Sequence, residues 1–491
     1  MIIKKDIDTI QNYLFDASNF KSKQCKAVFI PENIAEISQL IIEANQNKIP
    51  VSISGAGTGL TGGRVPNHGD YVISLERFNH IISIDTDNLK CTVQAGVSLW
   101  QLEEILNQYG LFYPPDPTEK NCSIGGTIAT NASGARSFKY GSTRNWIEAI
   151  KVVLPSGDVC VIKRSHISAN DYTLTFPSKS KKIYQINLPN IKMPNVKNSS
   201  GYFIKRNMDL IDLFIGSEGT LGIIVEATLR LVQVPKDLIS AVIFFENFDD
   251  LYDFVSSSRN QSNNEYSFIK PRALEFFDDK SLQLLSSKFP IAKSKKFAIW
   301  YEQEIYNEDI FIVLESLSNL VAGKKGDINN IWFAMDSKDL REIHEFRHSI
   351  SALVNEYIAQ KNLIKVGTDT AVLSEYFSEY YKYCRDKCLS NSIDFVGYGH
   401  IGNDHLHLNM LPENENSFKV ALDLYRDFCE LAVKFGGTVS AEHGIGKIKR
   451  DYFELMYTED EIRRMFEIKK TLDPNLILNR GNIFSEKFYS Q

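Results

Sequence analysis

The stretch that decides the fold spans residues 54–63 and reads Ser54-Gly55-Ala56-Gly57-Thr58-Gly59-Leu60-Thr61-Gly62-Gly63. It follows an apolar, β-branched run at residues 49–53, which predicts a strand. Five of the ten residues are glycines, and glycine lets backbone N–H groups approach an anion because no Cβ is in the way. The stretch therefore predicts a loop that binds a phosphate or pyrophosphate. The alternative is a glycine loop with a purely structural role.

Residues 57–62 also match the G-x-G-x-x-G fingerprint of Rossmann folds, and Glu76 lies about 20 residues downstream, where a ribose-binding acid is expected. The fingerprint requires a helix directly after the glycines. Here Pro66 and Gly69 lead into a second strand-like run at residues 71–75, which leaves no room for that helix. The sequence therefore predicts pyrophosphate binding outside a Rossmann fold.

Two more stretches of small residues lie downstream of the first glycine loop. Residues 123–134 carry no charged side chain, which permits close packing against a flat group; tight helix packing alone is the alternative. Residues 216–222 form a third glycine loop before a strand-like run at 223–232. The polar residues 163–200 between them predict a long surface excursion.

Bulk properties exclude several classes of protein. The chain has 491 residues, which suits two to four domains, and a net charge of −6 with both signs interspersed, which argues against nucleic-acid binding. No apolar run reaches the length of a membrane span, and the early acidic residues argue against a secretory signal. The seven cysteines are scattered without a C-x-x-C pair, so we expect reduced thiols and no iron–sulfur cluster.

Side chains that can bind a metal or accept a proton cluster toward the C-terminus, where His400, His405 and His407 fall within eight residues. Two predicted strands, 394–398 and 405–410, form a hairpin, so His400 and His407 can converge on one divalent ion. Downstream, Glu442 offers a third ligand and His443 a base, and two histidines with one carboxylate are typical of a catalytic metal site. The alternative is a set of satisfied polar groups in a hairpin.

Arg347 and Lys365 are candidates for binding a substrate carboxylate, since a cation in a site favours that group. Each is otherwise an ordinary surface cation. Beyond Pro235 strands and helices alternate, which predicts a second domain with a mixed or antiparallel sheet covered by helices on one face.

Together these stretches resemble the FAD-linked 2-hydroxyacid dehydrogenases of the vanillyl-alcohol-oxidase/PCMH flavoprotein superfamily. That family includes D-lactate dehydrogenases, the glycolate oxidase flavin subunit and D-2-hydroxyglutarate dehydrogenase. The resemblance runs from about residue 20 to 485 and rests on motifs in the family's order at residues 55–63, 114–134, 216–222, 399–409, 442–446 and 472–484.

The resemblance implies an α+β fold. A helical lead-in at residues 1–20 precedes a PCMH-type FAD-binding domain of two subdomains at residues 21–235. Residues 236–491 then form a ferredoxin-like FAD-linked oxidase C-terminal domain, which binds substrate and metal and ends in helices.

The resemblance also implies FAD as the cofactor. Some members tether FAD to a histidine of the first glycine loop, but Thr58 occupies that position here, so we expect non-covalent FAD. The implied FAD-binding residues lie in the three small-residue stretches and near the C-terminus: Ser54, Gly55, Ala56, Gly57, Thr58, Gly59, Leu60, Gly62, Pro114, Asp116, Ser123, Gly125, Gly126, Thr127, Ala129, Asn131, Gly134, Glu218, Gly222, Ile223, Ile224 and Asn479.

For the reaction centre, the resemblance implies that His400, His407 and Glu442 bind a divalent ion, with zinc expected and manganese or iron as alternatives. His443 is the implied catalytic base, and it contacts substrate together with Asn409, Arg347 and Lys365. Family members often read Asp-Gly-Asn between the two histidine ligands, whereas this chain has residues 403–405, Asn-Asp-His. The additional His405 either competes for the metal or points away from it.

The implied reaction is oxidation of a D-2-hydroxy acid, such as D-lactate, D-2-hydroxyglutarate or glycolate, by hydride transfer to flavin N5. The acceptor of the electrons is expected to be a quinone, a cytochrome or an electron-transfer flavoprotein. Alternatives are an oxidase, a non-redox enzyme similar to alkylglycerone-phosphate synthase, and the flavin subunit of a larger electron-transfer complex. We expect a cytoplasmic protein, either free or peripheral at the inner face of the membrane, and a homodimer is compatible with this reading.

Overall fold

The first glycine loop connects two parallel strands, β3 (Val51–Ser54) and β4 (Tyr71–Ser74), in the computed structural model, which describes residues 1–67, 69–259 and 266–489. A strand rather than a helix follows the glycines, so the exclusion of a Rossmann fold is confirmed. The two strands belong to a four-stranded sheet in the order β1-β2-β4-β3, with β1 (Ile2–Lys4) and β2 (Ala27–Ile30). Helix α2 (Ile34–Gln46), capped by Asn33, buries its apolar residues in this subdomain.

The N-terminal residues differ from the predicted helical lead-in. β1 pairs antiparallel with β2, and only α1 (Ile7–Ile10) and a 3-10 turn at Gln11–Tyr13 are helical. Ile10, Tyr13 and Leu14 share a small core with residues of β2 and β4. A three-residue strand has no periodicity of its own, because its partner in the sheet determines it.

The second subdomain is a five-stranded antiparallel sheet in the order β5-β6-β12-β8-β9. Its bounds are β5 (Ile81–Asp85), β6 (Lys90–Gln94), β8 (Ile147–Val153), β9 (Val159–Lys163) and β12 (Ile223–Arg230). Short strands β7 (Leu111–Phe112) and β13 (Val232–Gln233) pair beside it. The associated helices are α3 (Leu99–Asn107), α4 (Ile124–Thr130), α5 (Ser137–Tyr140) and α6 (Leu210–Phe214).

Part of the predicted surface excursion at residues 163–200 is regular structure. Strands β10 (Thr173–Pro177) and β11 (Ile183–Asn187) form a hairpin that buries Leu174, Phe176 and Ile186. The alternation of buried and exposed residues along both strands was hidden by the many lysines and serines around them.

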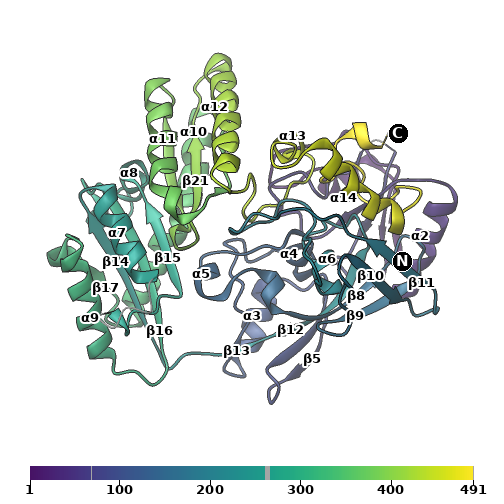
Figure 1. Ribbon diagram of the computed structural model, residues 1–491, viewed down its shortest axis with the longest axis horizontal. Helices are drawn as coiled ribbons and strands as arrows, with labels where there is room; N and C mark the ends of the chain where they lie inside the picture. The colour runs from purple at the N-terminus through teal and green to yellow at the C-terminus, as the bar shows by residue number, and fades with distance from the viewer. Residues whose placement is uncertain (68, 260–265, 490–491) are drawn as a thin grey trace.

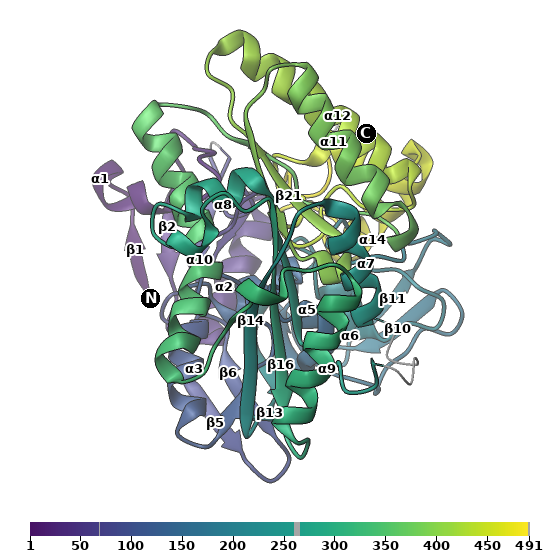
Figure 2. The same cartoon turned by 90° about the vertical axis from the view of Figure 1, so that its left-hand side faces the viewer.

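The third unit is an eight-stranded sheet built by β14 (Asp237–Phe245), β15 (Ala273–Phe277), β16 (Phe297–Ile305), β17 (Trp332–Phe333), β18 (Val366–Gly367), β19 (Thr370–Ala371), β20 (Phe395–Gly399) and β21 (His405–Met410). Its helices are α7 (Phe248–Arg259), α8 (Asp279–Leu285), α9 (Ile310–Gly323), α10 (Ser337–Lys361), α11 (Phe377–Ser390) and α12 (Glu415–Lys434). Figure 1 shows α11 and α12 side by side next to β21, whereas Figure 2 separates α10 from them and looks onto the long strands β14 and β16. Helices α8 and α10 pack on one face of the sheet and α7, α9, α11 and α12 on the other, so the prediction of helices on one face is wrong.

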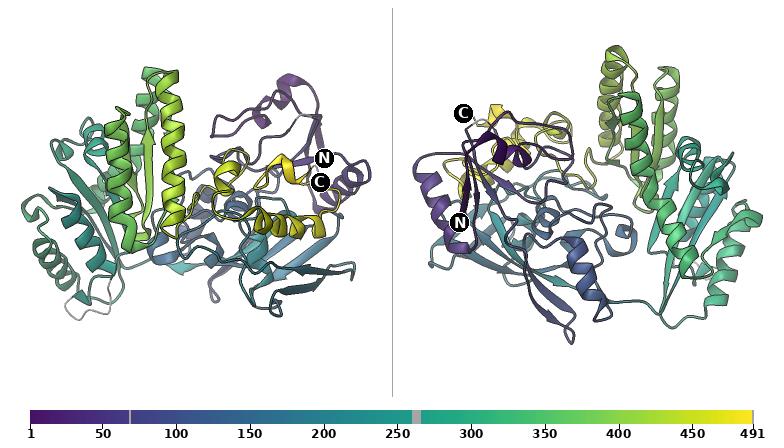
Figure 3. Two further views of the ribbon diagram at one scale, coloured as in Figure 1. Left: turned by 45° about the horizontal axis from the view of Figure 1, so that its top comes forward. Right: turned by 180° about the vertical axis from the view of Figure 1, so that it is seen from behind.

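The C-terminal segment leaves this unit and returns to the first subdomain. Helices α13 (Arg450–Phe453) and α14 (Glu459–Leu472) lie beside the N-terminal segments in Figures 1 and 3. Backbone hydrogen bonds join Val51 of β3 to Ile477 and Asn479. This return brings the residues after Glu442 against the first glycine loop.

All seven cysteines are buried and free in the structure. Among the described residues, no helix combines the length and the apolar character that crossing a membrane requires.

Candidate active site

A cavity of about 1630 Å³ lies between the glycine-rich loops and the eight-stranded sheet. Its wall includes parts of all three small-residue stretches, together with His400, His407, Glu442 and His443. Pockets for small ligands have volumes of roughly 300–1,000 Å³, so this cavity has room for a dinucleotide and a small substrate. The fold therefore brings the two predicted halves of the site together, although more than 300 residues separate them in the sequence.

Most of the predicted FAD-binding residues line this cavity. They are Gly55, Ala56, Gly57, Thr58, Gly59, Leu60, Ser123, Gly125, Gly126, Thr127, Ala129, Gly134, Glu218, Gly222, Ile223, Ile224 and Asn479. Ser54, Gly62, Pro114, Asp116 and Asn131 lie outside its lining. Asp116 instead forms ion pairs with Lys120 and Arg136, and Asn131 adopts the left-handed conformation that ends α4.

The second small-residue stretch forms helix α4 and its flanking turns. Ser123 caps the helix, because its hydroxyl accepts a hydrogen bond from the amide of Gly126 at 3.3 Å. A Cβ on Gly125 would lie 2.7 Å from the Cβ of Ala95, at the end of β6. The missing side chain therefore lets α4 approach the sheet.

Glu218 connects the third glycine loop to the predicted base. Its two carboxylate oxygens accept hydrogen bonds from the amides of Ile445 at 2.6 Å and Gly446 at 2.7 Å. Burial raises the pKa of Glu218 to about 7, although these two amide bonds lower it. Glu218 thus holds the turn that follows His443 against the cofactor loops.

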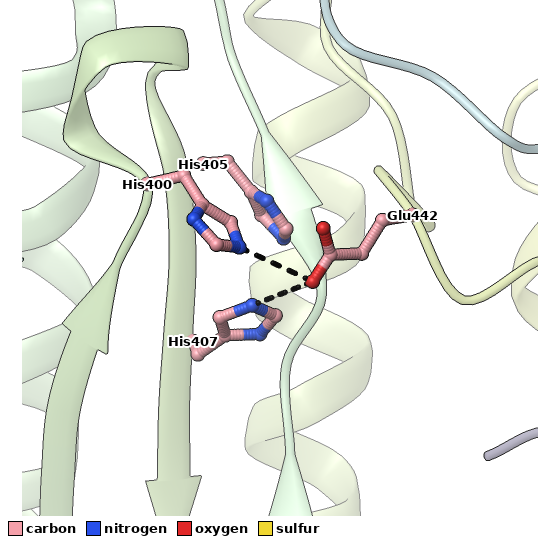
Figure 4. Close-up of side chains that lie close together, drawn as sticks. All are labelled: His400, His405, His407 and Glu442. Carbon is pink, nitrogen blue, oxygen red and sulfur yellow. Dashed lines mark hydrogen bonds and ion pairs between the residues drawn. The ribbon is translucent and has the colours of Figure 1, made fainter. Parts of the chain in front are cut away.

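His400 and His407 point at the same oxygen of Glu442, as Figure 4 shows. His400 follows β20 and His407 lies on β21, so the predicted hairpin is confirmed. The Nε2 atoms of His400 and His407 lie 3.3 and 3.1 Å from Glu442 Oε1. Ligand atoms of these residues and of His405 lie within 4.8 Å of one another.

Neighbouring groups orient both imidazoles. His400 Nδ1 lies 2.7 Å from Glu275 Oε1 on β15, and His407 Nδ1 lies 3.3 Å from the carbonyl oxygen of Thr368. Acceptors at Nδ1 favour the tautomer in which Nδ1 carries the proton and Nε2 keeps its lone pair. Both Nε2 atoms face Glu442 Oε1, where a bound ion would accept their lone pairs. Without an ion, burial lowers the pKa of His400 but the charge of Glu275 raises it above its usual value, which favours a protonated ring that donates from Nε2 to Glu442.

His405 is held in a different direction by two other groups. Its Nε2 lies 2.9 Å from Asp369 Oδ1 and its Nδ1 lies 3.2 Å from the ammonium of Lys197. Burial, followed by the charge of Lys197, lowers the pKa of His405 well below its usual value. His405 is therefore neutral, and both of its ring nitrogens are engaged.

Lys197 also donates to the second oxygen of Glu442, at 2.8 Å. Burial raises the pKa of Glu442, but the charges of Lys197 and His400 hold it well below its usual range. Glu442 is thus ionised, with Oε2 bound by Lys197 and Ser133 and Oε1 facing the histidines.

Asp369 orients His443 through contacts with its Nδ1 and its backbone amide. Its Oδ2 lies 3.3 Å from His443 Nδ1, accepts from the backbone amide of His443 at 3.0 Å and pairs with Lys449 at 2.8 Å. Burial raises the pKa of Asp369, but His443 and Lys449 hold it well below the usual range. Burial lowers the pKa of His443 to about 4, against the attraction of Asp369. His443 is therefore neutral near pH 7, and its Nε2, which lies 3.6 Å from Glu442 Oε1, is the ring nitrogen that can act as a base.

Of the two predicted carboxylate binders, Arg347 is already paired. Its guanidinium donates to Glu275 at 2.8 Å and to the hydroxyl of Thr118 at 3.0 Å. Lys365 lines the same cavity and forms no ion pair with any described residue. Asn409 also lines it, and its buried Nδ2 has no hydrogen-bond partner in the described chain.

Glu275, Asp369 and Lys197 were not among the predicted residues. Glu275 lies on β15, a strand that the sequence reading did not identify, although a single acid within the apolar run 273–277 was a usable signal. Lys197 lies in the polar stretch assigned to a surface excursion. The sequence carries no signal for its position, because only tertiary packing brings it to Glu442.

Comparisons with known proteins agree with this architecture. Residues 25–163 match the FAD binding domain, and residues 234–483 match the C-terminal domain of FAD linked oxidases. The chain is 30% identical over 480 residues to the glycolate oxidase subunit GlcD of Bacillus subtilis (strain 168), covering 96% of this chain and 92% of that protein. It is 32% identical over 465 residues to a D-lactate dehydrogenase of Anaerostipes hadrus, covering 91% and 87%.

A solved structure of 4-ethylphenol oxidase from Gulosibacter chungangensis, with isoeugenol, has the same fold. The TM-score is 0.70 with 17% identity, over 99% of this chain and 95% of that chain. At this identity the likeness concerns the fold alone. The predicted α+β architecture is confirmed: the chain belongs to the FAD-linked oxidase family, with a PCMH-type FAD-binding domain followed by an FAD-linked oxidase C-terminal domain.

Proposed function

We propose that this protein oxidises a D-2-hydroxy acid to the corresponding 2-oxo acid, with non-covalent FAD as the hydride acceptor. One observation carries the proposal: a neutral, Asp369-oriented His443 lies in the same cavity as the glycine-rich cofactor loops. A base beside a flavin suits proton removal from a hydroxyl group, coupled to hydride transfer from the same carbon. The names of the relatives, a glycolate oxidase subunit and a D-lactate dehydrogenase, support this substrate class.

The donor set at His400, His407 and Glu442 fits a divalent ion, and we propose zinc, with manganese or iron as alternatives. Zinc bonds of about 2.0–2.1 Å in a tetrahedron place neighbouring ligand atoms roughly 3.3 Å apart. The observed Nε2 to Oε1 distances of 3.3 and 3.1 Å are close to that separation. The contacts of Glu275 and Thr368 with Nδ1 are typical of histidines that bind metal through Nε2.

We propose that Lys365 and Asn409 bind the substrate carboxylate. Lys365, next to β18, lines the cavity and forms no ion pair with any described residue, and the Nδ2 of Asn409 is a donor without a partner among the described residues. Two nitrogens of Arg347, Nε and Nη2, donate to Glu275, and the third, Nη1, donates only to the hydroxyl of Thr118. Arg347 therefore contributes to carboxylate binding through Nη1. A charge already balanced by a buried carboxylate attracts a second anion weakly.

In the proposed mechanism His443 accepts the proton of the substrate hydroxyl at Nε2, and Asp369 stabilises the imidazolium that forms. Lys365 and Asn409 fix the carboxylate, which orients the hydroxyl toward His443. When bound, FAD supplies a hydride acceptor and the divalent ion supplies a Lewis acid that lowers the hydroxyl pKa. Glu218 keeps the turn after His443 in place throughout.

The experiment that tests this function is reduction of a dye by protein purified with FAD, using both enantiomers of lactate and 2-hydroxyglutarate together with glycolate. We expect dye reduction with at least one D-2-hydroxy acid, at least tenfold slower reduction with its L-enantiomer, and bleaching of the flavin absorbance without dye. If none of these hydroxy acids reduces the dye when FAD and Zn²⁺ or Mn²⁺ are supplied, the proposed function is wrong.

Replacing Lys365 with methionine is expected to raise KM for the hydroxy acid by about 10- to 100-fold, because a charge-assisted hydrogen bond of roughly 1.5–3 kcal/mol is lost. The kcat value should change by less than about threefold, since the contact is made equally before and during the reaction. Steady-state kinetics measure both values, with Lys361→Met on the exposed end of α10 as the control. An unchanged KM would remove Lys365 from the substrate site.

A further inference from the structure

A segment upstream of the matched FAD binding domain forms part of the cavity wall. The domain match begins at residue 25, yet Asp16, Ala17, Ser18, Asn19 and Lys21 all line the cavity. The backbone amide of Ala17 donates to the carbonyl oxygen of Gly57, in the first glycine loop, at 3.1 Å. We call residues 12–21 the N-terminal wall.

Arg64 joins this wall to the glycine loop. Its guanidinium donates to the carbonyl oxygens of Asn12 at 2.6 Å and Phe15 at 2.8 Å. It also reaches the hydroxyl of Ser54 at 3.3 Å and the carbonyl oxygen of Gly55 at 3.4 Å. A Cβ on Gly57 would lie 2.2 Å from the guanidinium carbon of Arg64, so the guanidinium packs directly against the loop backbone.

Arg64 donates to four neutral oxygens, and no carboxylate of the described residues forms an ion pair with it. Burial lowers the pKa of Arg64, and the charge of Asp16, beyond ion-pair distance, raises it only in part. The side chain is only half-exposed and lines the cavity. Removing an unpaired cation from water is costly, and an anion bound by the adjacent glycine loop would offset that cost.

Asp16, whose charge acts on that of Arg64, provides a second observation. Its Oδ1 accepts from the amide of Ser18 at 3.1 Å and from the hydroxyl of Ser18. Its Oδ2 is buried and has no hydrogen-bond partner among the described residues, while the whole residue is 4% exposed. This oxygen lies 3.8 Å from the position of a Cβ on Gly59, so it faces the glycine loop.

The side chains of Arg64 and Asp16 favour two different chemical groups of one ligand. A buried carboxylate oxygen without a donor favours a hydroxyl or amino group and disfavours a phosphate. A guanidinium favours a phosphate. A dinucleotide offers both kinds of group within a few bonds, because its pyrophosphate is flanked by hydroxyl-bearing carbon chains.

We propose that the N-terminal wall and Arg64 complete the FAD site. Arg64 supplies positive charge to the pyrophosphate at the glycine loop, and Asp16 Oδ2 accepts a hydrogen bond from a cofactor hydroxyl, either of the ribose or of the ribityl chain. This role concerns cofactor binding only and does not depend on which hydroxy acid is oxidised. It assigns a function to residues that precede the matched domain.

The test measures binding of FAD, ADP and riboflavin to protein freed of its flavin. ADP carries the pyrophosphate and ribose, whereas riboflavin carries the ribityl chain without phosphate. Arg64→Gln is expected to weaken FAD and ADP binding by about tenfold or more and to leave riboflavin binding unchanged, since a charge-assisted contact is removed. Arg206→Gln, at an exposed arginine paired with Asp171, is the matched control. Equal ADP affinities of the two variants would overturn the role of Arg64.

Asp16→Asn keeps Oδ1 for the Ser18 turn and replaces the free acceptor with a donor. We expect FAD binding to weaken at least fivefold; a parallel loss for ADP identifies a ribose hydroxyl, and a parallel loss for riboflavin identifies a ribityl hydroxyl. Unchanged affinity for all three ligands would mean that Asp16 serves the turn alone.

A measurement on the wild-type protein covers the case in which a variant does not fold. Hydrogen exchange of residues 12–21 should slow on addition of FAD, since a wall that contacts the cofactor loses its local opening motions. Exchange that is the same with and without FAD would overturn the proposal as a whole.

Discussion

Protein carrying His443→Gln is expected to bind FAD normally and to turn over about 10²–10⁴ times more slowly than the wild type, because general-base catalysis contributes that much. Glutamine keeps the polar volume of the imidazole but cannot accept the proton. His443 is neutral above pH about 4, because burial lowers its pKa. For the wild type, kcat/KM should therefore fall as the pH decreases through that value. Rapid-mixing kinetics of flavin bleaching measure the chemical step directly.

His166→Gln is the matched control, since His166 is an exposed histidine in the turn after β9. The control should retain wild-type kinetics. If His443→Gln bleaches its flavin at the wild-type rate, the base must be another group and the proposed mechanism is wrong. If it loses FAD instead, His443 belongs to the cofactor site and not to the reaction.

The second large effect is expected for His407→Ala. This substitution removes one proposed metal ligand, while Glu442 keeps its ion pair with Lys197 and its contact with His400, and the Nδ1 of His407 contacts only a backbone carbonyl. We expect the metal content to fall below one-tenth of the wild-type value and kcat to fall by about 10²–10³-fold, since several kcal/mol of Lewis-acid stabilisation are lost. The flavin absorbance should remain. Metal analysis by mass spectrometry, together with the absorbance spectrum, measures both outcomes.

The corresponding control is chelation of the wild-type protein, followed by addition of Zn²⁺ or Mn²⁺. Activity should disappear and return, whereas His407→Ala should not recover. A wild-type protein that contains no metal and is fully active after chelation would show that the His–Glu cluster is a hydrogen-bonded network. The role of His443 would then still stand, because Asp369 and not the metal orients it.

Some of the structural features behind these predictions can be predicted from the sequence, and others cannot. The hairpin that presents His400 and His407 followed from the sequence, because strand alternation and the short linker leave little choice of geometry. Pro66 and Gly69 likewise predicted that no helix follows residue 63. Both are local features, determined within about a dozen residues.

The side chains that orient these histidines and shift their pKa values could not be predicted from the sequence. Glu275, Asp369 and Lys197 approach from a strand, a loop and a polar segment that are distant from one another in the chain. Arg64 directly follows the first glycine loop, and Asp16 lies in residues 1–20, for which the sequence predicts a helical lead-in, so neither is a predicted cofactor-binding residue. In the structure, hydrogen bonds to Gly57 and Arg64 hold this segment against the cofactor loop.

By itself, the sequence determined the family, the cofactor class and the residues that carry reactive groups, because glycine loops and clustered histidines act through local spacing. Only the tertiary structure decided which charges act on each reactive group, which acceptors face each histidine nitrogen and which of the two candidate carboxylate binders is already paired. The sequence predicts both Arg347 and Lys365 as candidate carboxylate binders. Folding places Glu275 against Arg347 and leaves Lys365 unpaired, and pairing of this kind depends on contacts between residues far apart in the chain.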